Sequence, residues 1–135
     1  EHVQQGPPAY QPVIIHRDYH PGNLLWDKGR ISGVVDWVNA CMGPAGVDTG
    51  HCRVNLAILG GGEIADAFMD SYLAAGGLKE ASHPYWDMNA LTDFVTDPLE
   101  VHKGWLDLGL AMTTTLMAER LDSYAMEIAV RVRNG

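Results

Sequence analysis

Three oxygen-bearing side chains are spaced so that they could share a divalent cation and a reacting hydroxyl group. Asp18 follows a short β-branched run, Val13–Ile15, and Asn23 comes five residues later, directly after Pro21-Gly22. Asp36 lies further along, after two more strand-like segments. Carboxylate and amide oxygens suit Mg²⁺, which takes few protein ligands and completes its shell with water and phosphate oxygens. The spacing therefore predicts a magnesium site beside a loop, provided that the fold brings these three side chains together.

The segments around the loop predict how that could happen. Residues 23–26 and 31–35 favour two short strands, and Asp-Lys-Gly-Arg at 27–30 supplies turn residues between them. We expect a hairpin that returns Asp36 to the neighbourhood of Asn23. The run before the loop, with three β-branched residues in succession, is expected to be a buried strand.

From Asp48 onward the pattern becomes helical. Asp48 or Thr49 is expected to cap the first helix, because such side chains accept hydrogen bonds from the first helical turn. Glycine clusters and prolines mark the limits of the later helices. We expect helices at about 48–59, 63–75, 85–97 and 112–133, loops at 16–23 and 38–47, and no clear assignment for 99–111. Apolar stripes are expected at Ile64, Phe68, Tyr72 and Ala75 and at Met117, Leu121, Tyr124 and Ile128, with an ion pair between Glu127 and Arg131. The fold class that follows is α+β and mainly helical.

Composition narrows the function classes. A chain of 135 residues with 47% hydrophobic residues can form one domain with a core of its own. The net charge of −8 argues against a nucleic-acid backbone as partner and is compatible with a cationic substrate. No run of apolar residues is long enough to predict a membrane span. Two cysteines, Cys41 and Cys52, are too few for a disulfide scaffold and are expected to be free, half-buried thiols of a cytoplasmic protein.

The loop and its surroundings resemble a known family. The string HRDYHPGN at 16–23, followed by Asp36-Trp37 after a hairpin, resembles the aminoglycoside phosphotransferase and choline kinase superfamily, which has a protein-kinase-like fold. The segment GPAGVDTGHCRVNLA at 43–57 is similar to the family segment in which an Asp near the start of a helix supports the catalytic loop. The resemblance covers about residues 12–60. Arg17 stands where these kinases often have Gly, and Val38 where many relatives carry an acid.

The resemblance implies a role for each residue of the motif. Asp18 would be the catalytic base that accepts or orients the proton of a substrate hydroxyl. Asn23 and Asp36 would hold Mg²⁺ against the β- and γ-phosphates of ATP. His20 would contact a phosphate of the cofactor or brace the loop. The remaining two residues, His16 and Asp48, would be structural supports of the loop.

The resemblance also implies a domain organisation. Residues 13–135 would form the C-terminal lobe of a phosphotransferase, and residues 1–12, with three prolines, would be a linker from an N-terminal nucleotide lobe. The chain shows neither a glycine-rich phosphate loop after a strand nor a strand lysine for ATP. We therefore expect an ATP-dependent kinase of a small-molecule hydroxyl that is inactive as this fragment alone. The alternative is a non-catalytic module that keeps the fold and binds a ligand or partner. The exposed lobe face, around residues 1–40, is expected to be partly apolar and to self-associate.

Several residues allow two interpretations. The carboxylates on the later segments could line a substrate cleft, although a solvated helix face explains them as well; they are Asp87, Asp93, Asp97, Glu100 and Asp107. The four Trp residues are expected in the core or in a groove wall. A zinc site at His16, His20, His51 and the two cysteines is disfavoured, because no CxxC or HExxH spacing occurs.

Overall fold

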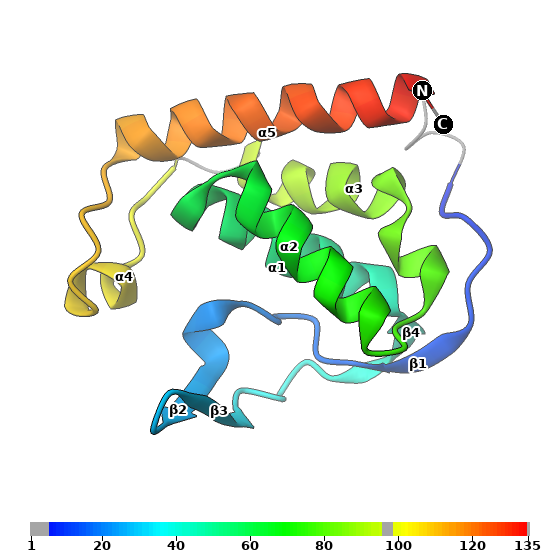
Figure 1. Ribbon diagram of the computed structural model, residues 1–135, viewed down its shortest axis with the longest axis horizontal. Helices are drawn as coiled ribbons and strands as arrows, with labels where there is room; N and C mark the ends of the chain where they lie inside the picture. The colour runs from blue at the N-terminus through cyan, green and yellow to red at the C-terminus, as the bar shows by residue number, and fades with distance from the viewer. Residues whose placement is uncertain (1–5, 96–98, 135) are drawn as a thin grey trace.

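The computed structural model describes residues 6–95 and 99–134, and these form an α+β arrangement that is mainly helical, as the sequence predicts (Figure 1). The helices are α1 (Ala45–Gly60), α2 (Gly62–Ala74), α3 (Pro84–Val95), α4 (Lys103–Asp107) and α5 (Thr114–Asn134), with short 3-10 turns η1 (Pro21–Asn23) and η2 (Lys79–Ser82). The strands are β1 (Pro12–Ile15), β2 (Leu24–Asp27), β3 (Arg30–Val34) and β4 (Cys41–Pro44). Each predicted helix and strand therefore has a counterpart, with ends that differ by a few residues.

The four strands form two separate antiparallel pairs. β2 pairs with β3 through a turn at Lys28 and Gly29, where φ is 48° and 77°. Positive φ at both central residues matches the twist of a two-residue hairpin turn. The hairpin lies at the side of the molecule away from α5 (Figure 1). The hairpin predicted around residues 27–30 is thus present.

The predicted loop at 38–47 is wrong in its second half. Residues 41–44 form β4, which pairs with β1 so that Met42 lies opposite Ile14. α1 begins directly afterwards, at Ala45, three residues before the predicted cap. Asp48 consequently lies in the first turn of α1 and does not cap it, because its carboxylate accepts hydrogen bonds from the backbone N–H groups of His16 and Arg17 instead.

The hydrophobic core lies between α1, α3 and α5. Gly50 of α1 allows the close approach of α3, because a Cβ at this position would lie 2.5 Å from the carbonyl oxygen of Trp86. α5 packs against both α1 and α3 and closes the core on their other side (Figure 1). The core side chains are Val54, Ala57, Ile58, Ala65, Ala90, Trp105, Met112, Met117, Leu121, Tyr124 and Ile128.

The two predicted apolar stripes have different outcomes. The stripe of α5 is confirmed, since all four of its residues are buried. The stripe of α2 is wrong, because the side chains that it buries are Ala65 and Met69, whereas Ile64 is exposed. Phe68 and Tyr72 are only half-buried and line a groove against β1. The buried face of α2 is therefore displaced by one position in the sequence, from the predicted Ile64 and Phe68 to Ala65 and Met69.

A partly buried ion network joins four helices. Arg53 of α1 forms an ion pair with Asp87 of α3 and donates to Asp66 of α2 at 2.7 Å. Arg131 of α5 donates to both carboxylate oxygens of Asp66, at 2.8 and 2.9 Å. Arg53 and Asp87 are almost fully buried, so their charges are compensated by each other and not by water. The predicted pair between Glu127 and Arg131 is also present, at 3.7 Å.

Large apolar side chains are exposed along the strands and their connections, in the region where a partly apolar lobe face is expected. They are Tyr10, Ile14, Leu25, Trp26, Ile31, Val35, Trp37, Val38 and Met42. The other two tryptophans, Trp86 and Trp105, are buried. Cys52 is buried but Cys41 is exposed, so the prediction of half-buried thiols holds for neither. Within residues 6–95 and 99–134, no helix is long and apolar enough to cross a membrane.

Candidate active site

The loop at residues 16–20 is hydrogen-bonded to α1 through the side chain of Asp48. The two carboxylate oxygens of Asp48 accept hydrogen bonds from the backbone N–H groups of His16, at 2.7 Å, and Arg17, at 2.8 Å. Both contacts join residues more than thirty positions apart in the sequence. They therefore attach the loop to α1, which is itself packed into the hydrophobic core. A carboxylate that receives two N–H donors makes charge-assisted hydrogen bonds, which are stronger than neutral ones. The contacts are those that a supporting role for Asp48 requires.

His16 links the loop to the end of the hairpin. Its buried ring accepts a hydrogen bond at Nδ1 from the N–H of Asp18, at 3.2 Å, and donates from Nε2 to the carbonyl oxygen of Val35, at 2.7 Å. The two contacts require the neutral tautomer with its proton on Nε2. The His16 ring therefore connects the backbone of Asp18 with that of Val35, the residue directly before Asp36.

The structure brings Asp18 and Asn23 into direct contact. The side-chain amide of Asn23 donates to the backbone oxygen of Asp18 at 2.8 Å and to its carboxylate Oδ2 at 3.2 Å. The residue before Asp36 is tied to the loop through the backbone, since the N–H of Val35 donates to the carbonyl oxygen of Asn23 at 2.9 Å. The carboxylate of Asp36 is exposed and forms no hydrogen bond or ion pair with the residues that the structure describes.

Two residues of this region have a left-handed backbone. Arg17 has a φ of 71° and Asp36 a φ of 64°, a region that non-glycine residues seldom adopt. Such conformations cost about 1–3 kcal/mol each and persist where neighbouring contacts enforce them. At position 17 the enforcing contact is the hydrogen bond to Asp48.

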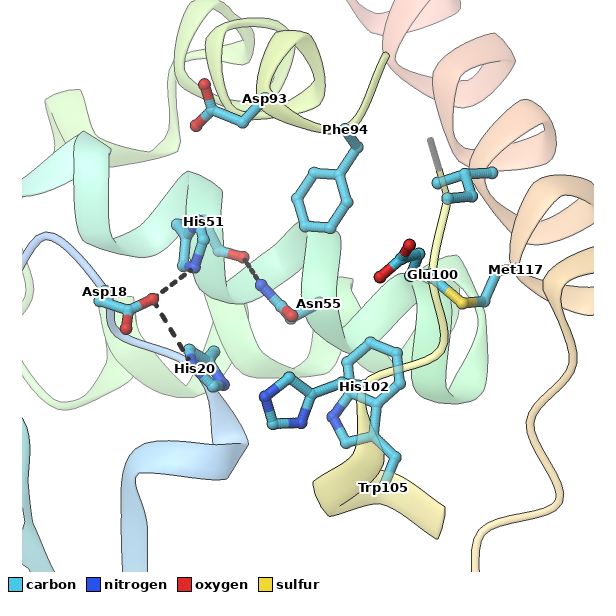
Figure 2. Close-up of a pocket in the computed structure, with 11 residues that line it drawn as sticks. Asp18, His20, His51, Asn55, Asp93, Phe94, Glu100, His102, Trp105 and Met117 are labelled. Atoms are coloured by element: carbon cyan, nitrogen blue, oxygen red, sulfur yellow. Dashed lines mark hydrogen bonds and ion pairs between the residues drawn. The ribbon is translucent and has the colours of Figure 1, made fainter. Parts of the chain in front are cut away.

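Asp18 faces a cavity between the loop, α1 and the segment that follows α3 (Figure 2). The cavity has a volume of about 290 Å³. Its polar walls include carboxylates and imidazoles, and its apolar walls include aromatic rings. The lining residues are Asp18, His20, His51, Asn55, Asp93, Phe94, Leu99, Glu100, His102, Trp105 and Met117.

Two imidazoles approach the carboxylate of Asp18. Its Oδ1 lies 3.3 Å from Nε2 of His51 and 3.5 Å from Nε2 of His20, as the dashed lines in Figure 2 mark. Nδ1 of His20 accepts a hydrogen bond from the N–H of Gly22. Burial lowers the pKa of His20 below its usual 6.5, and the neighbouring His51 and His102 lower it further, against an opposing effect of Asp18. His20 is therefore a neutral ring at physiological pH.

Two other groups near the loop are held in their neutral forms. Burial raises the pKa of the Cys52 thiol to about 12, and the nearby Asp48 raises it as well. Burial also raises the pKa of Tyr19, again assisted by negative neighbours. Cys52 is therefore not a thiolate nucleophile.

The family comparison agrees with this geometry. The model of the phosphotransferase enzyme family (APH) matches residues 1–86, which is more than half of the chain and includes every residue of the predicted site. The chain belongs to the phosphotransferase enzyme family. Searches of curated proteins and of solved structures give no significant match.

Phosphotransferases of this family generally use ATP and magnesium, and the donor set of the chain fits the cation. The Asn23 amide group points its NH₂ at Asp18, so its Oδ1 remains available, and the carboxylate of Asp36 is exposed. Within the described residues, no three His, Cys, Asp or Glu side chains are placed to hold a metal ion. A magnesium site built from one amide and one carboxylate would therefore complete its shell with water and phosphate oxygens.

The remaining carboxylates divide between the two interpretations given above. Asp93 and Glu100 line the cavity of this phosphotransferase-family chain. Asp107 lies on an exposed surface, paired with Lys103 at 2.7 Å. Asp87 fits neither interpretation, because it is buried against Arg53. Asp97 lies outside the described residues.

Sequence reasoning missed three polar residues of the cavity: His51, Asn55 and His102. A signal existed for the first two, because they lie three and seven residues after Asp48 and so share its face of α1. His102 had no such signal. It reaches the cavity because the segment before α4 folds back toward the loop, which places its ring 6.4 Å from that of His20.

Proposed function

We propose that this chain is the C-terminal catalytic lobe of an ATP-dependent phosphotransferase that acts on a hydroxyl group of a small molecule. The observation that carries the proposal is the carboxylate of Asp18. It faces the cavity, it is oriented by Asn23, and no Lys or Arg among the described residues forms an ion pair with it. A carboxylate in this setting can receive a proton from a bound hydroxyl.

Each residue of the loop has a proposed part in the reaction. Asp18 would orient the hydroxyl and take its proton as the hydroxyl oxygen bonds to the γ-phosphorus, while the bond from that phosphorus to the bridging oxygen of ATP breaks and ADP leaves. Asn23 and Asp36 would hold the magnesium ion through Oδ1 and the carboxylate, while His16 and Asp48 keep the loop in place. His20 either contacts a phosphate or braces the loop through Gly22. When bound, magnesium neutralises phosphate charge and ATP supplies the phosphoryl group.

The cavity supports a small, positively charged substrate. Asp93 and Glu100 provide negative charge, and Phe94 and Trp105 provide aromatic faces. Aromatic faces and carboxylates together favour a cation. Among the described residues that line the cavity, none is Lys or Arg. A volume of about 290 Å³ is at the lower limit for small-molecule sites, so the acceptor is small or enters only in part.

The proposal includes a nucleotide lobe encoded before this chain, with residues 1–12 as its linker and residues 13–135 as the C-terminal lobe. The exposed apolar side chains of residues 10–42 support it, because they give such a lobe a surface to cover. Without that lobe, the chain is expected to be inactive and to self-associate through this face. Light scattering that shows a monomer at high concentration would count against the self-association. The cytoplasm, where ATP is abundant, is the location that the proposal implies.

The test is turnover of the full-length protein. Phosphoryl transfer from ATP would be measured with kanamycin, choline and glucose as amino-sugar, amino-alcohol and sugar acceptors. Transfer to at least one of them is expected, and Asp18→Ala should lower the rate about 10²–10⁴-fold, the usual contribution of a general base. An Asp18→Ala variant that keeps the wild-type rate would contradict the assignment. Binding of an acceptor without turnover would favour a non-catalytic module.

A further inference from the structure

One face of α1 meets the loop at three successive points. Asp48 accepts from the backbone of residues 16 and 17, His51 contacts the carboxylate of Asp18, and Asn55 lines the cavity one turn further on. The spacing of three and then four residues places all three side chains on the same side of the helix. The loop backbone has a proposed support in Asp48, whereas the contact of His51 with the reacting carboxylate has no role yet.

The contact between His51 and Asp18 matters because a carboxylate without such contacts rotates easily about χ2. Asn23 holds Oδ2 of Asp18 at 3.2 Å, and His51 approaches Oδ1 at 3.3 Å from another element. One contact on each oxygen defines the plane of the carboxylate. His20 also approaches Oδ1, but it lies two residues from Asp18 on the same loop and would move with it.

His51 has a fixed frame of its own. α1 is anchored by fully buried side chains at Val54, Ala57 and Ile58, directly after the histidine. The imidazole ring lies between the ring of Phe94, at 6.3 Å between centroids, and that of His20, at 5.8 Å. Figure 2 shows the ring projecting from the helix toward Asp18. A side chain held in this way can position another without touching the substrate.

We propose that His51 is a positioning residue that sets the orientation of the Asp18 carboxylate for phosphoryl transfer. The inference rests on the proposed function, because it assumes that Asp18 is the base. The separation of 3.3 Å between Nε2 of His51 and Oδ1 of Asp18 is long for a hydrogen bond. Catalytic contacts often lengthen in the absence of substrate and tighten in the complex, so the Nε2–H group is expected to close on Oδ1 when an acceptor binds.

The chain offers a matched pair of variants at this position. In His51→Gln the side-chain amide nitrogen occupies about the place of Nε2 and can still reach Asp18. In His51→Asn the same amide ends near the place of Nδ1 and cannot. Both variants keep a neutral polar side chain on α1, so they differ in reach and not in chemistry. His83→Asn is the control, because His83 is exposed at the start of α3 and Asn retains an acceptor for the N–H of Tyr85.

The measurement is kcat and KM of the full-length protein with whichever of kanamycin, choline and glucose it accepts, or with water as acceptor in basal ATP hydrolysis. His51→Asn should lower kcat about 10–100-fold, as expected for a misplaced catalytic group, with little change in KM or melting temperature. His51→Gln should recover most of kcat, and His83→Asn should match the wild type. If His51→Asn lowers the melting temperature, rates are compared below the transitions of both variants.

Three results would overturn the inference: wild-type kcat in His51→Asn, equal losses in the Gln and Asn variants, or an effect confined to KM. Each is distinguishable from a failure of the proposed function by Asp18→Ala. If that variant loses transfer while the His51 variants do not, only the positioning role is wrong. If Asp18→Ala keeps full transfer, both the role of His51 and the assignment of the base are wrong.

Discussion

Two aspartates in this chain have opposite surroundings, although both lie within reach of α1. The side chain of Asp18 is 38% exposed, and the side chains that reach its carboxylate are an amide and imidazoles. Asp87 is almost fully buried and faces the guanidinium groups of Arg53 and Arg131. Asp87 is paired within the fold, and burial raises its pKa to about 6 against the opposing effects of Arg53 and Arg131, while the carboxylate of Asp18 faces the cavity. The comparison separates a carboxylate that is engaged in the fold from one that a ligand can reach.

The division has a physical basis. A buried charge is tolerated only with a partner, and removal of that partner leaves an uncompensated ion. A reactive carboxylate, in contrast, must be oriented without being neutralised. Asn23 and His51 contact the carboxylate of Asp18, and no Lys or Arg among the described residues forms an ion pair with it. Asp18 variants should therefore alter turnover, and Asp87 variants should alter the free energy of unfolding.

The largest effect on stability is expected for Asp87→Ala. The variant leaves Arg53 buried without its carboxylate, and such losses cost about 3–5 kcal/mol. Urea denaturation of the chain would give the change in the free energy of unfolding. The control is Asp107→Ala, which removes an exposed pair with Lys103 and should cost less than about 1 kcal/mol.

Asp18→Ala completes this comparison, since it should leave the free energy of unfolding close to that of the wild type. Equal losses in Asp18→Ala and Asp87→Ala would break the distinction between the two regions. A loss in Asp107→Ala as large as that in Asp87→Ala would show that burial is not what makes the Asp87 pair important.

A smaller effect is expected for Asp48→Ala, which tests how the two regions are joined. The change removes two hydrogen bonds to the backbone N–H groups of residues 16 and 17. Bonds to charged groups contribute about 1.5–3 kcal/mol each when buried, and these are partly exposed, so a combined loss of about 2 kcal/mol is expected. Denaturation would measure the loss, and hydrogen exchange should show faster exchange of these two amides.

Asp48→Asn should lie between the wild type and Asp48→Ala, because an amide keeps one acceptor oxygen. Asp70→Ala, at an exposed position on α2, is the control and should be neutral. Unchanged exchange at residues 16 and 17 in Asp48→Ala would mean that α1 does not hold the loop.

The smallest expected effect is a pH dependence that belongs to the loop region. Burial lowers the pKa of His20 below 6.5, so just below that pH the unfolded chain binds more protons than the folded chain. The contribution of His20 to stability is therefore present above about pH 6.5 and is lost as the pH falls. His20→Asn keeps an acceptor for the N–H of Gly22 and cannot titrate.

Denaturation of the wild type and of His20→Asn between about pH 7.5 and about pH 5 would measure the contribution of His20 to the free energy of unfolding. Asp87, whose pKa burial raises to about 6, titrates in both proteins, so the difference between them reports on His20. As the pH falls, the free energy of unfolding of the wild type should decrease relative to that of His20→Asn. Identical slopes would show that the His20 ring does not resist protonation.

The loop was predictable from the sequence because its chemistry is local. His16, Asp18 and Asn23 lie within eight residues, and strong turn signals define the hairpin that precedes Asp36. The expectation that Asp18 and Asn23 meet could be stated without the fold, although their catalytic roles stay predictions. Asp48 was assigned to the loop only through the family resemblance, and its position in the first turn of α1 came from the structure.

The ion network of the helices and the cavity, unlike the loop, could not be predicted from the sequence. Arg53, Asp66, Asp87 and Arg131 come from four different helices, and nothing in their spacing shows that these helices converge. The orientation of α2 was missed for a related reason. Its small buried residue, Ala65, gives a weak apolar signal, whereas Phe68 and Tyr72 are larger and face a groove. Pairing of β4 with β1 also depends on contacts distant in sequence.

The most direct test of the central claim is the position of a divalent ion in the full-length protein. Crystals grown with Mn²⁺ and a non-hydrolysable ATP analogue would locate the ion by its anomalous scattering. The account predicts an ion bound by Oδ1 of Asn23 and by the carboxylate of Asp36, with the carboxylate of Asp18 facing the acceptor cavity. An ion bound away from both residues, with the side chains of 18, 23 and 36 directed to different surfaces, would contradict it.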